Sequence, residues 1–216
     1  MKNEPEDKVR HKRASLQLSR LERLTDVVYA LVIWRAFTLL PRPTAEEWSG
    51  EALGGFLADN VMAFVLVFIA IAVSIIYWVQ NNTLFGNLEQ TDTRHTALSI
   101  LQLFFLLLFL LSMRLGVEFG GSLLSRVFES VAAALVGITG GWAWSYAIKE
   151  RRLLLPEVTD SYARQLRDRI LAEPLTATIT ILLAFVGPVV WEIGWLTYPL
   201  IVVLVRRRRE GRESIE

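Results

Sequence analysis

Two uncharged stretches decide the fold of this 216-residue chain: VMAFVLVFIAIAVSIIYWV at residues 61–79 and ALSILQLFFLLLFLLSM at residues 97–113. A helix rises about 1.5 Å per residue, so about 20 largely apolar residues cross the roughly 30 Å hydrocarbon core of a bilayer. Both stretches come close to this length. Within hydrocarbon the backbone must satisfy its own hydrogen bonds, and a single apolar stretch does so as a helix. The sequence therefore predicts an all-α, polytopic helical membrane protein.

Composition supports this class of protein. Hydrophobic residues make up 53% of the chain and the mean hydropathy is +0.39, which is too apolar for a soluble surface. The 23 Lys and Arg residues nearly balance the 22 Asp and Glu residues, so the net charge does not indicate nucleic acid as a partner. Because the chain has no cysteine, disulfides, thiolate metal sites and cysteine nucleophiles are excluded.

Further apolar stretches bring the expected number of spans to about six. The run 170–205 is too long for one span and is broken at Gly187-Pro188, so we expect a hairpin of two spans there. Residues 149–173 carry both signs of charge and are interpreted as a helical extension and linker. The expected organisation is a tail at 1–21, a transmembrane domain at 22–205 with spans at about 22–40, 61–79, 97–113, 127–148, 170–187 and 190–205, and a basic tail at 206–216.

The cationic residues predict the orientation of these spans. If the N-terminus is cytoplasmic, 19 Lys and Arg residues fall in inner segments and only Arg42, Arg114 and Arg126 fall in outer ones. Cytoplasmic loops carry such an excess of positive charge. We therefore expect both termini in the cytoplasm, with the Arg206–Arg209 cluster against the anionic lipid of the inner leaflet.

The sequence offers few groups for catalysis or metal binding. The only histidines, His11 and His95, lie far apart in predicted cytoplasmic segments, without a ligand-forming partner at suitable spacing, and we expect both to be solvated. No glycine-rich phosphate loop or serine elbow is present. We expect no enzyme activity, no metal and no cofactor.

The first span is unusual because it contains two ionisable residues, Asp26 and Arg35. A charge inside hydrocarbon is costly, so such residues carry a functional hypothesis by default. At about 100° per residue they lie on different faces and do not pair along the helix. One face holds Leu24, Val27, Leu31, Arg35 and Thr38; the other holds Asp26, Tyr29, Ile33 and Phe37. We expect Asp26 to turn toward neighbouring helices and the leucine face to meet another structure.

Three segments of the sequence carry a resemblance to a known family. The stretch RLERLTD at residues 20–26 resembles the R-x-x-x-F-S-D signature that opens the first span of the transmembrane protein 175 family of potassium channels. The stretch YWVQNNTLF at residues 77–85 is similar to its W-x-x-H-x-x-x-F stretch, and Asp92 with LQLFFL at 101–106 is similar to the segment opening its third span. The chain departs from the family at Leu24, Thr25, Val27, Asn81, Gln102 and Met113, so the resemblance is one of pattern.

The resemblance implies a homotetramer of six-span units in the plasma membrane of a prokaryote, with first spans around a central pore. It implies a constriction of bulky apolar side chains at Leu31, with the next layer near Trp34, Arg35 and Thr38. It further implies a hydrogen-bond network that holds the pore helix against the second and third spans. By position this network comprises Arg20, Leu24, Thr25, Asp26, Trp78, Asn81 and Gln102.

Arg35 leaves the permeant ion open. Four arginines around a central pore would oppose potassium, because arginine rings favour anions. Alternatively, Arg35 reaches the outer surface or pairs with Asp59, Glu118, Glu129 or Glu192. We expect a potassium-permeable cation channel with a hydrophobic gate, since no T-V-G-Y-G filter is present. The alternatives are an anion-conducting or non-conducting protein on the same fold, and a small-solute transporter.

Overall fold

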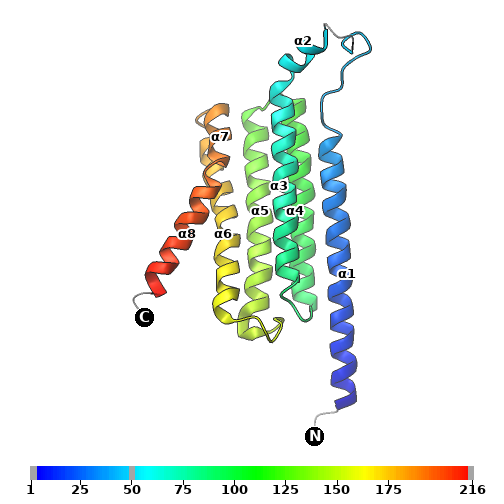
Figure 1. Cartoon of the computed structure of the whole chain (residues 1–216), viewed down its shortest axis with the longest axis vertical. Coiled ribbons are helices and arrows are strands. Elements are labelled where there is room, and N and C mark those ends of the chain that lie inside the picture. Colours follow the sequence, from blue (N-terminus) through cyan, green and yellow to red (C-terminus); the bar gives the residue numbers. More distant parts are fainter. Residues whose placement is uncertain (1–3, 49–51, 214–216) are drawn as a thin grey trace.

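The computed structural model describes residues 4–48 and 52–213, and this part of the chain consists of helices joined by turns and loops, without a β-strand (Figure 1). The expected all-α fold is thus confirmed. Its helices are α1 (Glu4–Phe37), α2 (Ala52–Asp59), α3 (Val61–Phe85), α4 (Thr93–Glu118), α5 (Leu123–Ile148), the 3₁₀ turn η1 (Lys149–Arg151), α6 (Asp160–Leu183), α7 (Pro188–Trp195) and α8 (Tyr198–Glu213).

Short polar side chains fix where the long helices begin. The carboxylate of Asp92 accepts a hydrogen bond from the backbone N–H of His95 at 2.9 Å, which caps α4. Ser122 caps α5 and Thr159 caps α6 in the same way, through the backbone N–H groups three residues later. Such caps satisfy backbone donors that a helix leaves free in its first turn.

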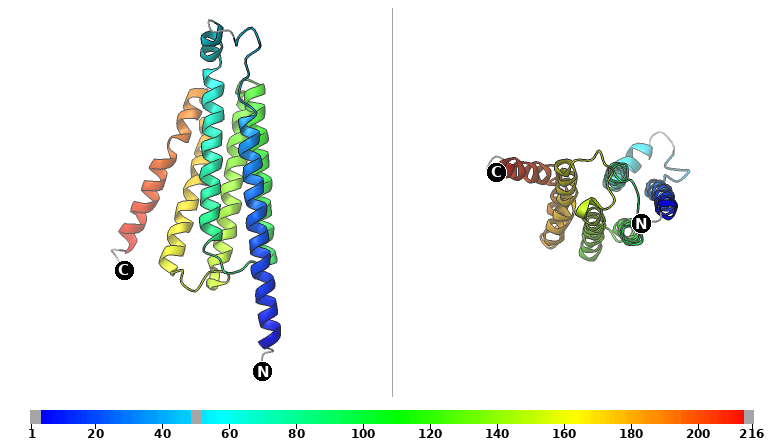
Figure 2. Two further views of the ribbon diagram at one scale, coloured as in Figure 1. Left: turned by 45° about the vertical axis from the view of Figure 1, so that its right-hand side comes forward. Right: turned by 90° about the horizontal axis from the view of Figure 1, so that it is seen from below.

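The long helices run roughly along one axis, and both described ends of the chain point toward the same end of the bundle, the lower end in Figure 1. Helix α5 packs between α4 and α6, α1 packs on α3 and α4, and α8 packs on α6. Figure 2 shows α1 and α8 at opposite sides of the bundle when it is seen from below. Helix α1 is therefore a peripheral element of a single chain.

Glycines let α5 approach both neighbouring helices closely. A Cβ atom at Gly140 would lie 2.6 Å from the side-chain nitrogen of Gln102 on α4. A Cβ atom at Gly137 would lie 2.7 Å from Cδ of Pro174, which is inside α6. Small residues at such contacts are characteristic of helix packing in membranes. Any larger side chain at either position would push two helices apart.

The end of the chain folds as a broken hairpin on α5 and α6. Gly187 and Pro188 form the turn between α6 and α7, at the predicted position, with Pro188 at the start of α7. The sixth predicted span is divided into α7 and α8, which are separated at Leu196 and Thr197. The side chains of Thr180 and Trp191 both donate hydrogen bonds to Ser130 of α5, at 3.0 and 2.8 Å. These two bonds hold the hairpin against the bundle.

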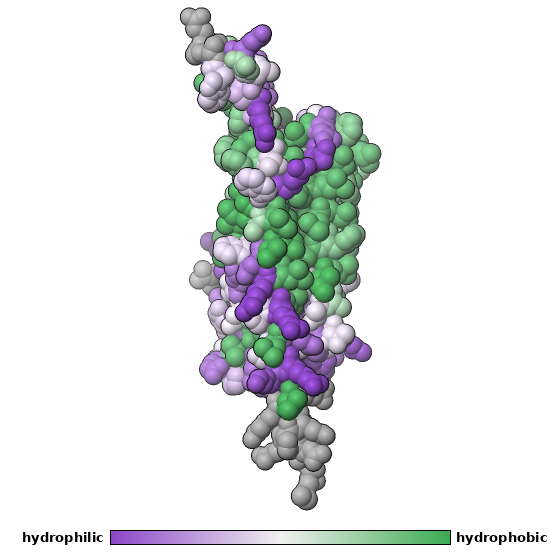
Figure 3. All heavy atoms as spheres, turned by 90° about the vertical axis from the view of Figure 1, so that its right-hand side faces the viewer, coloured by the Kyte–Doolittle hydropathy of each residue, from purple (hydrophilic) through white to green (hydrophobic). Residues whose placement is uncertain are grey.

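Three helices in the described residues are long and apolar enough to cross a membrane by length and composition: Ala63–Phe85, Thr93–Glu118 and Leu123–Arg151. Helices α1 and α6 are also long, but charged residues in their lower halves exclude them by this measure. Figure 3 shows the face that carries α1, where apolar side chains form a band between polar ends. The chain is a multi-pass membrane protein, and the helices present are consistent with about six spans.

Candidate pore helix and its hydrogen bonds

One face of α1 is buried against α3 and α4. Its most buried side chains in the upper half are Thr25, Tyr29, Val32 and Ala36, each no more than 2% exposed. These residues recur every three or four positions, so they form one stripe along the helix. The stripe fixes the rotation of α1 relative to the rest of the bundle.

The opposite face of α1 is apolar and exposed in the single chain. Leu24, Val27, Leu31 and Trp34 are between 45% and 64% exposed. Their spacing of three or four residues places them on one stripe. The helical wheel had placed Leu24, Val27 and Leu31 together on one face, without Trp34. Phe37 is also 53% exposed, although the wheel placed it with Asp26 on the other face. The exposed stripe faces lipid or further copies of the chain.

Asp26 lies at the edge between the two faces and bonds to α3. The indole N–H of Trp78 donates to its carboxylate at 2.9 Å. Both side chains are partly exposed, so the contact closes the rim of the α1–α3 interface. Two of the motif residues are thus brought together, and the expected turn of Asp26 toward a neighbouring helix is observed.

A second, deeper contact joins the same two helices through a residue that sequence reasoning did not select. The amide nitrogen of Asn81 donates to the hydroxyl of Tyr29 at 2.7 Å, with both side chains buried. Asn81 therefore bonds to Tyr29 and does not reach Asp26. A tyrosine in an otherwise apolar stripe was the available signal, because a buried hydroxyl needs a polar partner.

The other motif residues lie apart from this contact. Thr25 is buried, and its hydroxyl has no hydrogen-bond partner in the described structure. Gln102 is buried and packs against Gly140 of α5. Arg20 is exposed. The residues that the structure brings together around α1 are Asp26 with Trp78, and Tyr29 with Asn81.

Arg35 and Thr38 lie at the upper end of α1. The Arg35 side chain is exposed and reaches the hydroxyl of Thr38 at 3.5 Å. The same hydroxyl donates to the backbone carbonyl of Arg35 at 2.6 Å. None of the ion pairs among the described residues joins Arg35 to the four carboxylates considered as partners. Within one chain, the Arg35 guanidinium therefore lies exposed at the end of α1, beside Thr38.

At the lower end, Asp92 connects α4 to α5. The hydroxyl of Tyr146 donates to its second carboxylate oxygen at 2.5 Å. Partial burial raises the pKa of Asp92, but the hydrogen bonds from His95 and Tyr146 outweigh it and leave the pKa below its ordinary value. The expectation of a solvated His95 is wrong: its side chain is 3% exposed, with one ring nitrogen 2.8 Å from the hydroxyl of Thr91.

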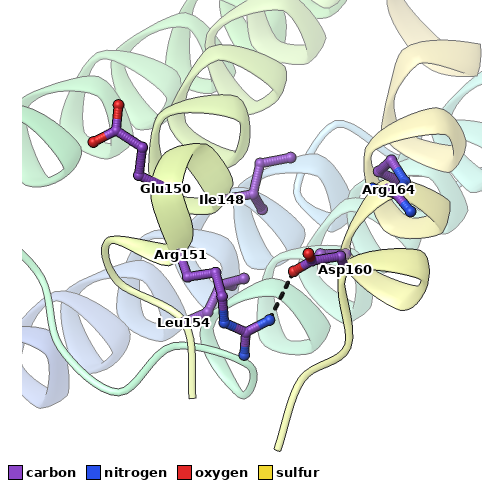
Figure 4. A pocket seen from close by; sticks show the side chains of 7 residues that line it. Ile148, Glu150, Arg151, Leu154, Asp160 and Arg164 are labelled. Atoms are coloured by element: carbon purple, nitrogen blue, oxygen red, sulfur yellow. Dashed lines mark hydrogen bonds and ion pairs between the residues drawn. The ribbon is translucent and has the colours of Figure 1, made fainter. Parts of the chain in front are cut away.

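A small hollow of about 240 Å³ also lies at the lower end, between η1 and the start of α6. Figure 4 shows the Arg151 guanidinium beside Asp160, at 2.7 Å. The same guanidinium donates to the backbone carbonyls of Leu155 and Pro156. Its hydrogen bonds thus hold the loop between α5 and α6 together. This structural role explains why Arg151 lies at the hollow, and no bound ligand is needed to explain it.

Comparison with known proteins finds a family similar to the segment that contains the upper half of α1. Residues 20–109 match the family model of the endosomal/lysosomal potassium channel TMEM175. Over this segment, which is less than half of the chain, the sequence is similar to the TMEM175 family. The match begins at Arg20 of α1 and ends at Phe109 of α4, so it includes both polar contacts of α1. The resemblance inferred from the sequence is confirmed.

Solved TMEM175 structures extend the likeness to most of the fold. One is a lysosomal potassium-selective channel TMEM175 homolog from Chamaesiphon minutus, with 15% identity and a TM-score of 0.67, covering 88% of this chain and 95% of that one. Another is a variant of the potassium channel MtTMEM175, solved with a nanobody fusion, with 17% identity and a TM-score of 0.63, covering 89% and 93%. No curated protein matches the chain significantly. The chain thus shares the fold of TMEM175 channels beyond its family segment.

Proposed function

We propose that the protein is a potassium-permeable cation channel in the plasma membrane of a prokaryote, with both termini in the cytoplasm. The observation that carries this proposal is the TMEM175 match over residues 20–109, the segment that contains the upper half of α1, all of α3 and most of α4. The two similar solved structures are both described as potassium channels.

The pore of this channel is lined by α1 from four copies of the chain. The support for this arrangement is the apolar stripe on α1, which remains exposed while the opposite face is fixed against α3 and α4. Leu31 lies in the middle of the stripe and is 59% exposed. A ring of four such leucines excludes water when it is narrow, and hydrophobic constrictions gate channels by this dewetting. Trp34 forms the next layer of this pore.

The alternative function rests on Arg35. Its side chain is exposed near the stripe and lacks a carboxylate partner among the ion pairs of the described residues. Four such charges facing the pore would favour anions. In the proposed cation channel, the guanidinium instead reaches the outer surface through its position at the end of α1, beside Thr38.

Reversal potentials in planar bilayers under potassium, sodium and chloride gradients test the proposal. Purified wild type, Leu31→Ala, Arg35→Ala and the control Leu182→Ala should be compared; Leu182 is an exposed leucine of α6. We expect potassium-selective current that rises several-fold in Leu31→Ala and is unchanged in Leu182→Ala. The mass of the complex should correspond to four chains.

Chloride-selective current that is lost in Arg35→Ala would instead establish the anion-conducting alternative. Silence from all variants, with a folded oligomer demonstrated, would establish a non-conducting protein on the channel fold. An equal effect of Leu31→Ala and Leu182→Ala would contradict the assignment of α1 to the pore.

A further inference from the structure

Glu173 is a buried acid inside the helix bundle. Its side chain is 7% exposed, and its Oε1 atom has no hydrogen-bond partner in the described structure. The sequence placed it at the end of the polar linker 149–173, but it lies in the middle of α6, directly before Pro174. Sequence reasoning missed this residue because the surrounding charges resemble a solvated segment.

Four other helices meet around this carboxyl group. Tyr77 on α3 lies close enough for its hydroxyl to interact with it. Tyr29 on α1 and Tyr198 on α8 lie close enough to interact with it electrostatically. On α5 the neighbour is Gly137, where a Cβ atom would lie 3.1 Å from Oε1. The titratable groups facing Glu173 from other helices are therefore tyrosines.

A cation to balance a negative charge is lacking at this site. No ion pair among the described residues includes Glu173. The charged group of this region is Arg169, one turn earlier on α6, and it interacts with Tyr198. An isolated carboxylate in an apolar interior is costly, so such groups take up a proton instead. A protonated acid also gains a donor, which a carboxylate lacks.

We propose that Glu173 binds a proton and, as a neutral acid, positions the pore helix α1 through a buried cluster with Tyr29, Tyr77 and Asn81. Tyr29 accepts a hydrogen bond from Asn81, so its own hydroxyl proton is directed elsewhere. The unpartnered Oε1 of Glu173 is the acceptor for this proton, directly or through one water molecule, as buried polar groups are commonly satisfied.

The cluster therefore links α1 and α3 to α6, in addition to the contact at Asp26. As long as Glu173 is neutral, the link carries no net charge. Loss of the proton would place a negative charge beside two tyrosines and loosen the packing of α1. The role in positioning a pore helix rests on the proposed function, whereas proton binding by Glu173 does not.

Infrared spectroscopy of the purified full chain in lipid nanodiscs tests proton binding directly. Wild type, Glu173→Gln and the matched control Glu129→Gln should be compared at neutral pH; Glu129 is a half-buried glutamate of α5. We expect the wild type to show the C=O stretch of a protonated carboxylic acid. The part of this band that comes from Glu173 should be absent in Glu173→Gln and present in Glu129→Gln. The band should disappear in alkaline buffer. Absence of a band specific to Glu173 at neutral pH would overturn the proposal.

Thermal unfolding of the same samples tests the positioning role. Glutamine keeps the size and neutrality of the protonated acid, so Glu173→Gln should unfold at the wild-type temperature at neutral pH. Glu173→Leu leaves the tyrosines without their partner, and we expect its unfolding temperature to fall by about 2–4 °C or more, the shift that about 1 kcal/mol causes in a chain of this size.

In alkaline buffer the wild type should lose stability relative to Glu173→Gln. An equal loss in both Glu173 variants at neutral pH would show that the negative charge is required, and would overturn the proposal. These spectra and melting curves need no ion flux. A chain that does not conduct but shows the band contradicts only the proposed function, and a conducting chain without the band contradicts only this inference.

Discussion

The two faces of α1 differ in what their side chains do. The buried face holds Thr25, Tyr29 and Val32 against α3 and α4, whereas the exposed face presents Leu24, Leu31 and Trp34. Both faces are largely apolar, so composition does not separate them. The difference is that the Tyr29 hydroxyl has a polar partner inside the bundle, whereas the Thr25 hydroxyl has none in the described structure. Substitutions on the buried face should therefore change stability, and those on the exposed face should change conduction.

The largest effect is expected from Tyr29→Ala. This change removes a fully buried aromatic ring and the hydrogen bond to Asn81, whose amide nitrogen keeps only its bond to the backbone carbonyl of Tyr77. Losses of about 3–5 kcal/mol are usual for truncation of large buried aromatic side chains. Thermal unfolding in detergent should show a markedly lower midpoint. Tyr29→Phe, which removes only the hydroxyl, should lose about 1 kcal/mol. Equal midpoints for Tyr29→Ala and wild type would remove the distinction between the two faces.

An intermediate effect is expected from Trp78→Phe at the rim. Phenylalanine keeps an aromatic ring but cannot donate the hydrogen bond to Asp26. Hydrogen bonds between membrane helices contribute about 1 kcal/mol, so the unfolding midpoint should fall less than in Tyr29→Ala. In the double variant with Asp26→Asn, the two losses should be less than additive, because both remove one bond. Full additivity would show that the bond contributes nothing.

The smallest effect on stability is expected from Leu31→Ala. The leucine is 59% exposed in the single chain, so its truncation opens no cavity inside the bundle. The unfolding midpoint of the dissociated chain should stay at the wild-type value, although conduction of the assembled channel rises. A clear loss of stability in the dissociated chain would place Leu31 on the buried face.

The class of fold and the position of the motif residues could be predicted from the sequence, because both depend on local composition and spacing. The apolar runs at 61–79 and 97–113 became the cores of α3 and α4, because hydrocarbon admits little else than a helix there. The resemblance to the TMEM175 family also placed Asp26 and Trp78 in one hydrogen-bond network, and the structure joins these two side chains. Local composition and motif spacing carry this information.

The buried polar residues could not be predicted in the same way. Glu173 follows a charged stretch, and only the packing of α6 shows that it turns into the bundle. His95 lies next to a predicted loop, yet it is enclosed by the turn that begins α4. The burial of Glu173 depends on contacts with helices that are distant in sequence. The burial of His95 depends on the direction of a turn, which the sequence pattern does not define.

Helix α1 runs unbroken for 34 residues, about 50 Å, from the lower end of the bundle to its upper end. Apart from Pro5 in its first turn, it contains no proline and no glycine, the residues at which helices most often bend. It therefore behaves as a stiff rod. Its lower turns, where His11 lies 3.4 Å from Glu89, are more than five turns away from Leu31. In the proposed channel, a partner that displaced these lower turns would therefore move the constriction at Leu31 without any contact near the pore.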